Sequence, residues 1–124
     1  MNILVADDNE DGRIITSTLL KERGHDVVDA PNGKIALEMI KKSAPDLIVT
    51  DILMPEMDGF ELCRQVRAIP ECCDVIFIIY TGSYKSMADI ELGRALGANE
   101  YIIKPQEPNK LIKLLEKAIL DHKK

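Results

Sequence analysis

The 124-residue sequence lacks several features that would assign it to a broad class of proteins. It has no run approaching the roughly 18 consecutive apolar residues of a membrane-spanning helix. Its first ten residues, MNILVADDNE, have no basic region before the apolar stretch and so do not resemble a secretory signal peptide. It also has no internal repeat, low-complexity tract or linker. We therefore expect one domain, residues 1–124, located in the cytoplasm and without membrane contact.

Basic residues and metal-binding cysteine patterns are also scarce. The sequence has 16 Lys and Arg against 21 Asp and Glu, a net charge of −5, which argues against nucleic-acid contact by this domain. Its three cysteines, Cys63, Cys72 and Cys73, are an odd number and lack the spacing of a zinc site. We interpret them as reduced thiols that pack as small hydrophobic side chains.

Short apolar runs alternate with longer segments of helical periodicity. We predict strands at 2–6, 25–30, 46–51, 74–81 and 98–104, and helices at 10–24, 32–43, 59–69, 84–96 and 107–124. Three of the strands are almost entirely apolar, as expected when helices cover both faces of a parallel sheet. The alternation predicts a doubly wound α/β domain.

Two of the predicted helices have features that bear on packing. In the helix predicted at 10–24, Ile15, Leu19 and Leu20 share one face. The helix predicted at 84–96 is weakly patterned and contains Gly93, which lowers helix propensity. We expect this second helix to be a low-stability, movable element.

Ligands of such folds bind at the carboxyl ends of the strands. Here the predicted strands end at Asp7-Asp8, Asp51, Thr81 and Lys104. Taken singly, each has an ordinary interpretation: acids can cap a helix or occupy a turn, a threonine can end a strand, and a lysine can be solvated. Taken together, three converging carboxylates repel one another unless a cation lies between them, and oxygen ligands suit Mg²⁺. The set suits phosphoryl transfer to a carboxylate nucleophile.

Four segments carry a family resemblance: ILVADDNE (3–10), PDLIVTDILMPEMDGFEL (45–62), IIYTG (78–82) and GANEYIIKP (97–105). In order and spacing the chain resembles the receiver domains of two-component response regulators, including chemotaxis-regulator-like members. The resemblance implies a (βα)5 domain with a five-stranded parallel sheet in order 2-1-3-4-5 and helices on both faces. It also implies that Asp51 accepts a phosphoryl group from the phosphohistidine of a histidine kinase or phosphotransfer protein.

The resemblance further implies the metal ligands. Asp8 matches the acid that binds Mg²⁺ directly, Asp7 the acid that acts through a water, and the Leu53 backbone carbonyl a third protein ligand beside Asp51. Mn²⁺ or Ca²⁺ would substitute for Mg²⁺ in vitro. The chain would act as a phosphoacceptor that catalyses its own phosphorylation and loses the group slowly, rather than as a turnover enzyme.

Other positions match residues that respond to the phosphoryl group or shape the loops. Thr81 and Lys104 match residues that contact the phosphoryl group, and Thr81 and Tyr101 match the switch pair. Pro55 and Gly59 match loop positions after the acceptor, and a cis peptide bond is expected before Pro105. The altered face would comprise the fourth strand, fourth helix, fifth strand and fifth helix, and it would act on a downstream protein partner or an attached output domain. The receiver would then be stand-alone or excised from a hybrid histidine kinase or multidomain regulator.

Three other functional classes remain open at this point. A Mg²⁺-dependent phosphohydrolase that uses an aspartyl-phosphate would usually place a second acid where Leu53 stands. A flavin-binding electron carrier would need a Ser/Thr/Gly-rich loop after the first strand, where acids stand instead. A receiver-like binding module would use the same fold without phosphorylation.

Overall fold

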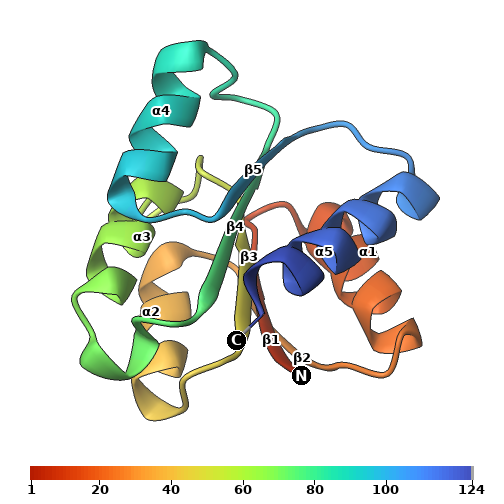
Figure 1. Cartoon of the computed structure of the whole chain (residues 1–124), viewed down its shortest axis with the longest axis horizontal. Coiled ribbons are helices and arrows are strands. Elements are labelled where there is room, and N and C mark those ends of the chain that lie inside the picture. Colours follow the sequence, from red (N-terminus) through yellow and green to blue (C-terminus); the bar gives the residue numbers. More distant parts are fainter. Residues whose placement is uncertain (124) are drawn as a thin grey trace.

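A computed structural model of the protein describes residues 1–123 and has five parallel strands between two layers of helices. The strands are β1 (Asn2–Ala6), β2 (Asp26–Ala30), β3 (Leu47–Thr50), β4 (Ile76–Thr81) and β5 (Glu100–Ile103). The helices are α1 (Glu10–Glu22), α2 (Gly33–Lys42), α3 (Gly59–Arg67), α4 (Met87–Leu96) and α5 (Pro108–His122). Helices α1 and α5 cover one face, and α2, α3 and α4 cover the other (Figure 1). The sheet order β2-β1-β3-β4-β5 confirms the predicted doubly wound fold.

The apolar runs of the sequence form the central strands. Every residue of β3 and β4 is buried, because both faces of these strands are covered by helices. Alternate side chains point to opposite faces, so each strand contributes to two hydrophobic clusters. Ile48 and Phe77 pack on the side of α2 and α3, whereas Leu47 and Ile78 pack with α5.

Helix α1 is rotated relative to the prediction. Ile15 is 52% exposed, and the buried positions of the helix are Thr16, Ser17 and Leu20. Small side chains at positions 16 and 17 allow the helix backbone to lie close to the sheet, which turns the face bearing Ile15 toward solvent. The interpretation of Ile15 as part of a shared apolar face with Leu20 is therefore wrong.

The other differences lie at element ends. Helix α3 ends at Arg67, and a 3₁₀ helix, η1 (Pro70–Cys72), precedes β4. Helix α4 begins only at Met87, because Ser86 and Asp89 form a capping box at its N-terminus. No helix among residues 1–123 is both long and apolar enough to cross a membrane.

The glycine inside α4 has a packing role. Gly93 is buried, and a Cβ atom there would lie 3.0 Å from the ring of Tyr101 and from Cδ1 of Ile79. A glycine therefore lets α4 lie directly on β4 and β5, at the cost of helix propensity that made the sequence signal weak.

Candidate functional site at the carboxyl edge of the sheet

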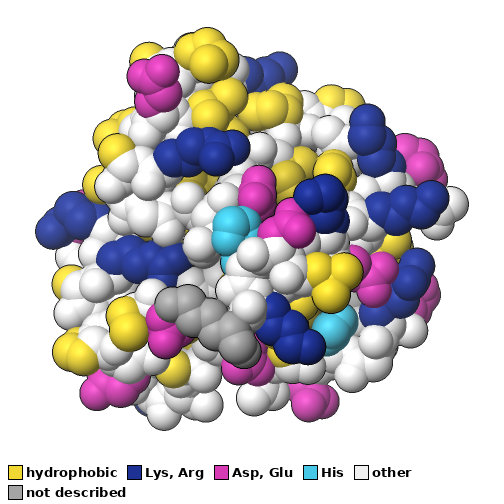
Figure 2. Space-filling model, viewed as in Figure 1, with side chains coloured by type: hydrophobic (Ala, Val, Ile, Leu, Met, Phe, Trp, Pro, Cys, Tyr) yellow, Lys and Arg dark blue, Asp and Glu magenta, His cyan; other side chains and the backbone are white. Residues whose placement is uncertain are grey.

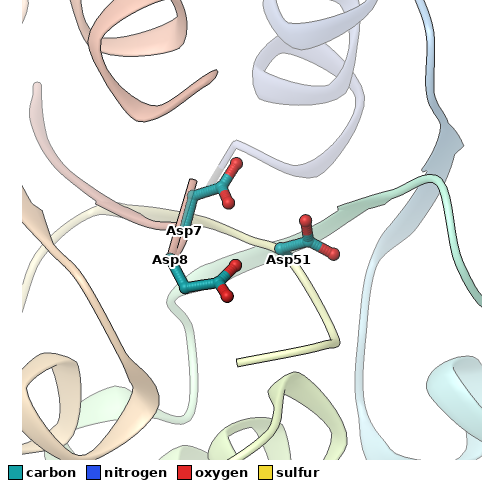
Figure 3. A group of neighbouring side chains, drawn as sticks. All are labelled: Asp7, Asp8 and Asp51. Carbon is teal, nitrogen blue, oxygen red and sulfur yellow. The ribbon is translucent and has the colours of Figure 1, made fainter. Parts of the chain in front are cut away.

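Three carboxylates follow the ends of two adjacent strands. Ala6 of β1 is paired with Thr50 of β3, so Asp7 and Asp51, the next residues, emerge side by side. Oxygen atoms of Asp7, Asp8 and Asp51 all lie within 4.8 Å of one another. Figure 3 shows the carboxylates of Asp7 and Asp8 extending toward the side on which Asp51 lies. Asp7 is buried, Asp51 is partly buried and Asp8 is exposed.

One lysine links two of these acids across the sheet. The Lys104 Nζ atom lies 2.9 Å from Oδ2 of Asp7 and 2.9 Å from Oδ2 of Asp51. Burial by itself lowers the pKa of Lys104, but the hydrogen bonds and charges of the two carboxylates outweigh it and leave the pKa raised. Three carboxylates face one ammonium group, so the site has negative charge in excess and attracts a further cation.

Backbone contacts fix the position of Asp51. Its Oδ1 atom accepts a hydrogen bond from the Ile52 N–H at 2.6 Å. The N–H of Gly59 donates to the Ile52 carbonyl at 2.9 Å, which brings the start of α3 against this turn. A Cβ atom at position 59 would collide with the Asp51 carbonyl oxygen, so only glycine permits the approach.

A turn with an unusual backbone conformation occupies the loop between β3 and α3. The Met57 N–H donates to the Pro55 carbonyl at 2.8 Å, and Glu56 between them has a positive φ of 70°. Leu53, two residues after Asp51, is 57% exposed. The loop therefore begins at a constrained carboxylate and returns to it through the start of α3.

The ends of β4 and β5 complete the site. Thr81 is fully buried, and its Oγ1 atom accepts a hydrogen bond from the Ser83 N–H at 3.3 Å. The Lys104–Pro105 peptide bond is cis, in agreement with the expectation from the sequence. A cavity of about 670 Å³ opens beside these elements, and its lining includes Asp51, Lys104 and Pro105.

Comparison with known proteins identifies the family. The family model described as "Response regulator receiver domain" matches residues 3–116. The chain belongs to this family. Its fold and its convergent strand ends are therefore those of a receiver domain, a module of two-component signalling.

Both short and long proteins are similar to this receiver domain. An uncharacterized 14.6 kDa protein from the sodA1 3′ region of Leptolyngbya boryana is 39% identical over 97% of this chain and 91% of its own length. The probable transcriptional regulator ycf27 of Galdieria sulphuraria is 37% identical over 88% of this chain, which spans only 41% of that protein. The structure of the chemotaxis response regulator CheY4 of Vibrio cholerae has a TM-score of 0.88 at 31% identity, and the alignment covers 94% of this chain and 97% of CheY4.

The acidic pocket of this receiver domain has the donors that Mg²⁺ requires. Receiver domains generally bind this ion at such a pocket, and the cluster of Asp7, Asp8 and Asp51 offers hard oxygen ligands within 4.8 Å of one another. The excess of negative charge over Lys104 supplies the attraction. The donor set therefore fits the ion, and the role of the Leu53 carbonyl as a further ligand stays a prediction.

Tyr101 of the receiver domain lies on β5 under α4. Its hydroxyl group donates a hydrogen bond to the Tyr84 carbonyl oxygen, and Tyr84 in turn packs edge-on against Phe60 at a ring-centroid distance of 5.9 Å. Burial and the charges of Asp89 and Asp51 raise the pKa of Tyr101 to about 12. Tyr101 thus connects β5 to the loop that precedes α4, and its role as a switch stays a prediction.

Exposed hydrophobic side chains gather over the adjacent helix. Met87 and Leu92 of α4 are 70% and 46% exposed. In Figure 2 hydrophobic side chains cluster at the top of the molecule, over α4, while charged side chains are scattered over the rest of this face. The receiver domain therefore presents exposed apolar side chains on α4, the helix that packs over Tyr101 through Gly93.

One residue of the site was missed in the sequence. The Arg13 Nη1 atom donates a hydrogen bond to the Asp7 backbone carbonyl at 2.8 Å. Its only sequence signal is a position in the first turns of α1, where an arginine is an ordinary exposed helix residue. No local pattern indicates that its guanidinium group turns back toward β1.

Proposed function

We propose that this receiver domain accepts a phosphoryl group on Asp51 from the phosphohistidine of a histidine kinase or phosphotransfer protein, in a Mg²⁺-dependent reaction. The single observation that carries the proposal is the placement of Asp51 at the end of β3, within reach of the oxygens of Asp7 and Asp8 and paired with Lys104. A partly buried carboxylate among cation ligands suits a nucleophile whose product is more negative than itself.

The transfer makes one bond and breaks one. An Asp51 carboxylate oxygen attacks phosphorus, the P–N bond to the donor histidine breaks, and the imidazole leaves with the bonding electron pair. The product is an acyl phosphate on Asp51. Asp8, Asp51, the Leu53 carbonyl and, through water, Asp7 would hold Mg²⁺, which supplies charge neutralisation for the phosphoryl oxygens when bound.

The residues of this chain then respond to the added charge. Lys104, now paired with Asp7 and Asp51 at 2.9 Å, would shift to a phosphoryl oxygen, and Thr81 would turn from the Ser83 N–H to another. We propose that this movement changes the packing of Tyr101 and α4, which shifts the population between two arrangements of the face formed by α4, β5 and α5. That face would act on a protein partner or an attached output domain.

Phosphorylation by a small-molecule donor tests the proposal. The full chain is incubated with acetyl phosphate or phosphoramidate and Mg²⁺, and intact mass is recorded at intervals. We expect the gain of one phosphoryl group, its loss on prolonged incubation, and no gain when EDTA replaces Mg²⁺. The Asp51→Asn variant should gain nothing, while Asp58→Asn, which alters a helix cap outside the acid cluster, should behave as the parent.

Two outcomes would support other functions. Steady hydrolysis of a phosphate ester would favour a phosphohydrolase, although Leu53 stands where those enzymes usually have a second acid. Phosphorylation of Asp51→Asn at the parental rate would overturn the proposal that Asp51 is the phosphoacceptor. Absence of phosphorylation in both the parent and Asp51→Asn would also overturn it and would favour a binding module.

We also propose a cytoplasmic location. Cys63, Cys72 and Cys73 are free thiols, and Cys63 and Cys72 are buried. Unpaired cysteines suit a reducing compartment.

A further inference from the structure

We propose that Arg13 is a positioning residue for metal binding, because it fixes the peptide unit from which Asp8 projects. The inference rests on the proposed function in that it concerns the same acid cluster. It assigns a role to a cation of α1 that contacts the backbone carbonyl of Asp7 and none of the carboxylate oxygens of Asp7, Asp8 and Asp51.

Asp8 needs an external constraint. Its side chain is exposed, and among residues 1–123 no hydrogen bond or ion pair holds its carboxylate. Asp7, by contrast, is held at both oxygens: Oδ1 accepts from the Asn9 N–H at 3.0 Å, and Oδ2 contacts Lys104. The direction of the Asp8 side chain therefore depends on the orientation of its backbone.

That backbone orientation is set on both sides of Asp7. The Asp7 N–H donates to the Ala30 carbonyl at the end of β2 at 3.1 Å. The Asp7 carbonyl, which belongs to the peptide unit joining Asp7 to Asp8, accepts from Nη1 of Arg13 at 2.8 Å. Rotation of this peptide unit would move the Asp8 carboxylate away from Asp51, and the hydrogen bond from Arg13 opposes that rotation.

Arg13 is itself anchored. Its Nε atom lies 3.3 Å from Oδ2 of Asp29 on β2, and its side chain is only 16% exposed. One guanidinium group thus ties the β1–α1 loop to the edge strand. A planar group with several donors can hold both partners in fixed geometry, which a lysine cannot.

A positioning role and a purely electrostatic role of Arg13 predict opposite effects of its removal on metal affinity. If Arg13 acted only through its positive charge, its removal would favour binding of a divalent cation beside Asp7 and Asp8. If Arg13 positions Asp8, its removal disorders a ligand and weakens binding, although a repelling charge has been removed. The sign of the change therefore distinguishes the two roles.

The test measures Mn²⁺ affinity of the full chain by electron paramagnetic resonance of the free ion, for the parent, Arg13→Met and Arg13→Lys. Methionine keeps much of the side-chain bulk without donors, and lysine keeps the charge. We expect both variants to bind Mn²⁺ on the order of tenfold more weakly, as is typical for residues that orient metal ligands. Arg23→Met, which removes an exposed arginine from the other end of α1, should remain within about twofold of the parent.

A second readout uses the metal-free protein. Order parameters from ¹⁵N relaxation should fall at the Asp8 amide in Arg13→Met and stay unchanged in Arg23→Met. Parental or tighter Mn²⁺ binding by folded Arg13→Met would overturn the inference. Should Arg13→Met fail to fold, Arg13→Lys decides by the same criterion.

This outcome is separable from that of the proposed function. If Mn²⁺ binding depends on Arg13 but the chain gains no phosphoryl group, only the phosphoacceptor role is overturned. If Asp51 is phosphorylated but Arg13→Met binds Mn²⁺ with parental affinity, only the positioning role is overturned.

Discussion

The charged side chains at the two ends of the sheet are satisfied in different ways. At the carboxyl ends of β1 and β3, three carboxylates face one lysine, and their oxygens crowd within 4.8 Å. At the amino ends of β4 and β5, Arg67 at the end of α3 donates its hydrogen bonds, as far as residues 1–123 show, to neutral oxygens. The acid cluster therefore has an excess of negative charge, whereas the guanidinium group of Arg67 has its hydrogen-bond donors paired.

Arg67 connects several segments at this second end. Its Nη2 atom donates to the Gly97 carbonyl at 2.9 Å and to Oδ1 of Asn99 at 3.0 Å, and Nη1 donates to the Cys72 carbonyl at 3.0 Å. The same Oδ1 atom of Asn99 accepts from the Phe77 N–H at 2.8 Å. The end of α3, the start of β4 and the turn before β5 are therefore joined by one network.

The difference shows where stability and function reside. Hydrogen bonds to neutral carbonyl groups satisfy Arg67 and leave nothing for a ligand, so this end stabilises the fold. The acid cluster keeps like charges together, which costs stability and leaves affinity for a cation. Substitution of Arg67 should therefore alter the stability of the fold, whereas substitutions in the acid cluster should alter cation binding.

The largest effect is expected from Arg67→Ala. Loss of this network should lower the free energy of unfolding by about 2–3 kcal/mol, because several partly buried acceptors lose a charged donor. Urea unfolding without metal measures it. Arg64→Ala, one turn earlier on α3 and paired with Glu61 at the surface, should change the unfolding midpoint little. A weaker Mn²⁺ affinity in folded Arg67→Ala would contradict the separation of the two ends.

Lys104→Met should increase metal affinity, whereas Arg67→Ala should lower stability. It removes the cation that lies 2.9 Å from both Asp7 and Asp51, so Mn²⁺ affinity at pH 7.5 should rise on the order of tenfold. Phosphorylation of Asp51 should nevertheless fall, because the phosphoryl group loses its ammonium partner. Lys110→Met, which alters an exposed lysine of α5, is the control. Unchanged or weaker Mn²⁺ binding in Lys104→Met would show that the ammonium group does not compete with the metal.

The smallest effect is expected from alkaline titration of Tyr101. The pKa of this phenol is about 12 in the folded protein and about 10 in an unfolded chain. The folded state therefore favours the protonated form, so this stabilising contribution is complete below pH 10 and is lost as pH rises toward 12. Between pH 9 and 11, the urea midpoint should fall further for the parent than for Tyr101→Phe. Equal falls in the two proteins would show that Tyr101 titrates as an ordinary exposed phenol.

Sequence patterns predicted most of the fold because the central strands β1, β3 and β4 are almost continuous runs of apolar residues. β1 was predicted with the bounds that the structure has, and β3 and β4 within two residues, since buried parallel strands are continuous apolar runs. The start of α4 was predicted three residues early, because the capping box at Ser86 lies beyond a stretch without clear periodicity. The burial of Thr16 and the exposure of Ile15 could not be predicted, since they depend on how closely α1 approaches the sheet.

The candidate site was predictable to the extent that it is made of strand ends. Asp7, Asp8, Asp51 and Lys104 are brought together by parallel register alone. Arg13 and Arg67 escaped prediction because each long side chain turns back to a backbone carbonyl of another segment. Such contacts depend on tertiary distance and leave no periodicity in the sequence.

The ion pair between Lys104 and Asp7 joins residues that are 97 positions apart. During synthesis on a ribosome, Asp7, Asp8 and Asp51 emerge well before β5, and the lysine arrives only with that last strand. A chain cut short before β5 would carry Asp7, Asp8 and Asp51 without the ammonium group of Lys104. The full set of charges around Asp51 is therefore present only after the whole domain has been synthesised and folded.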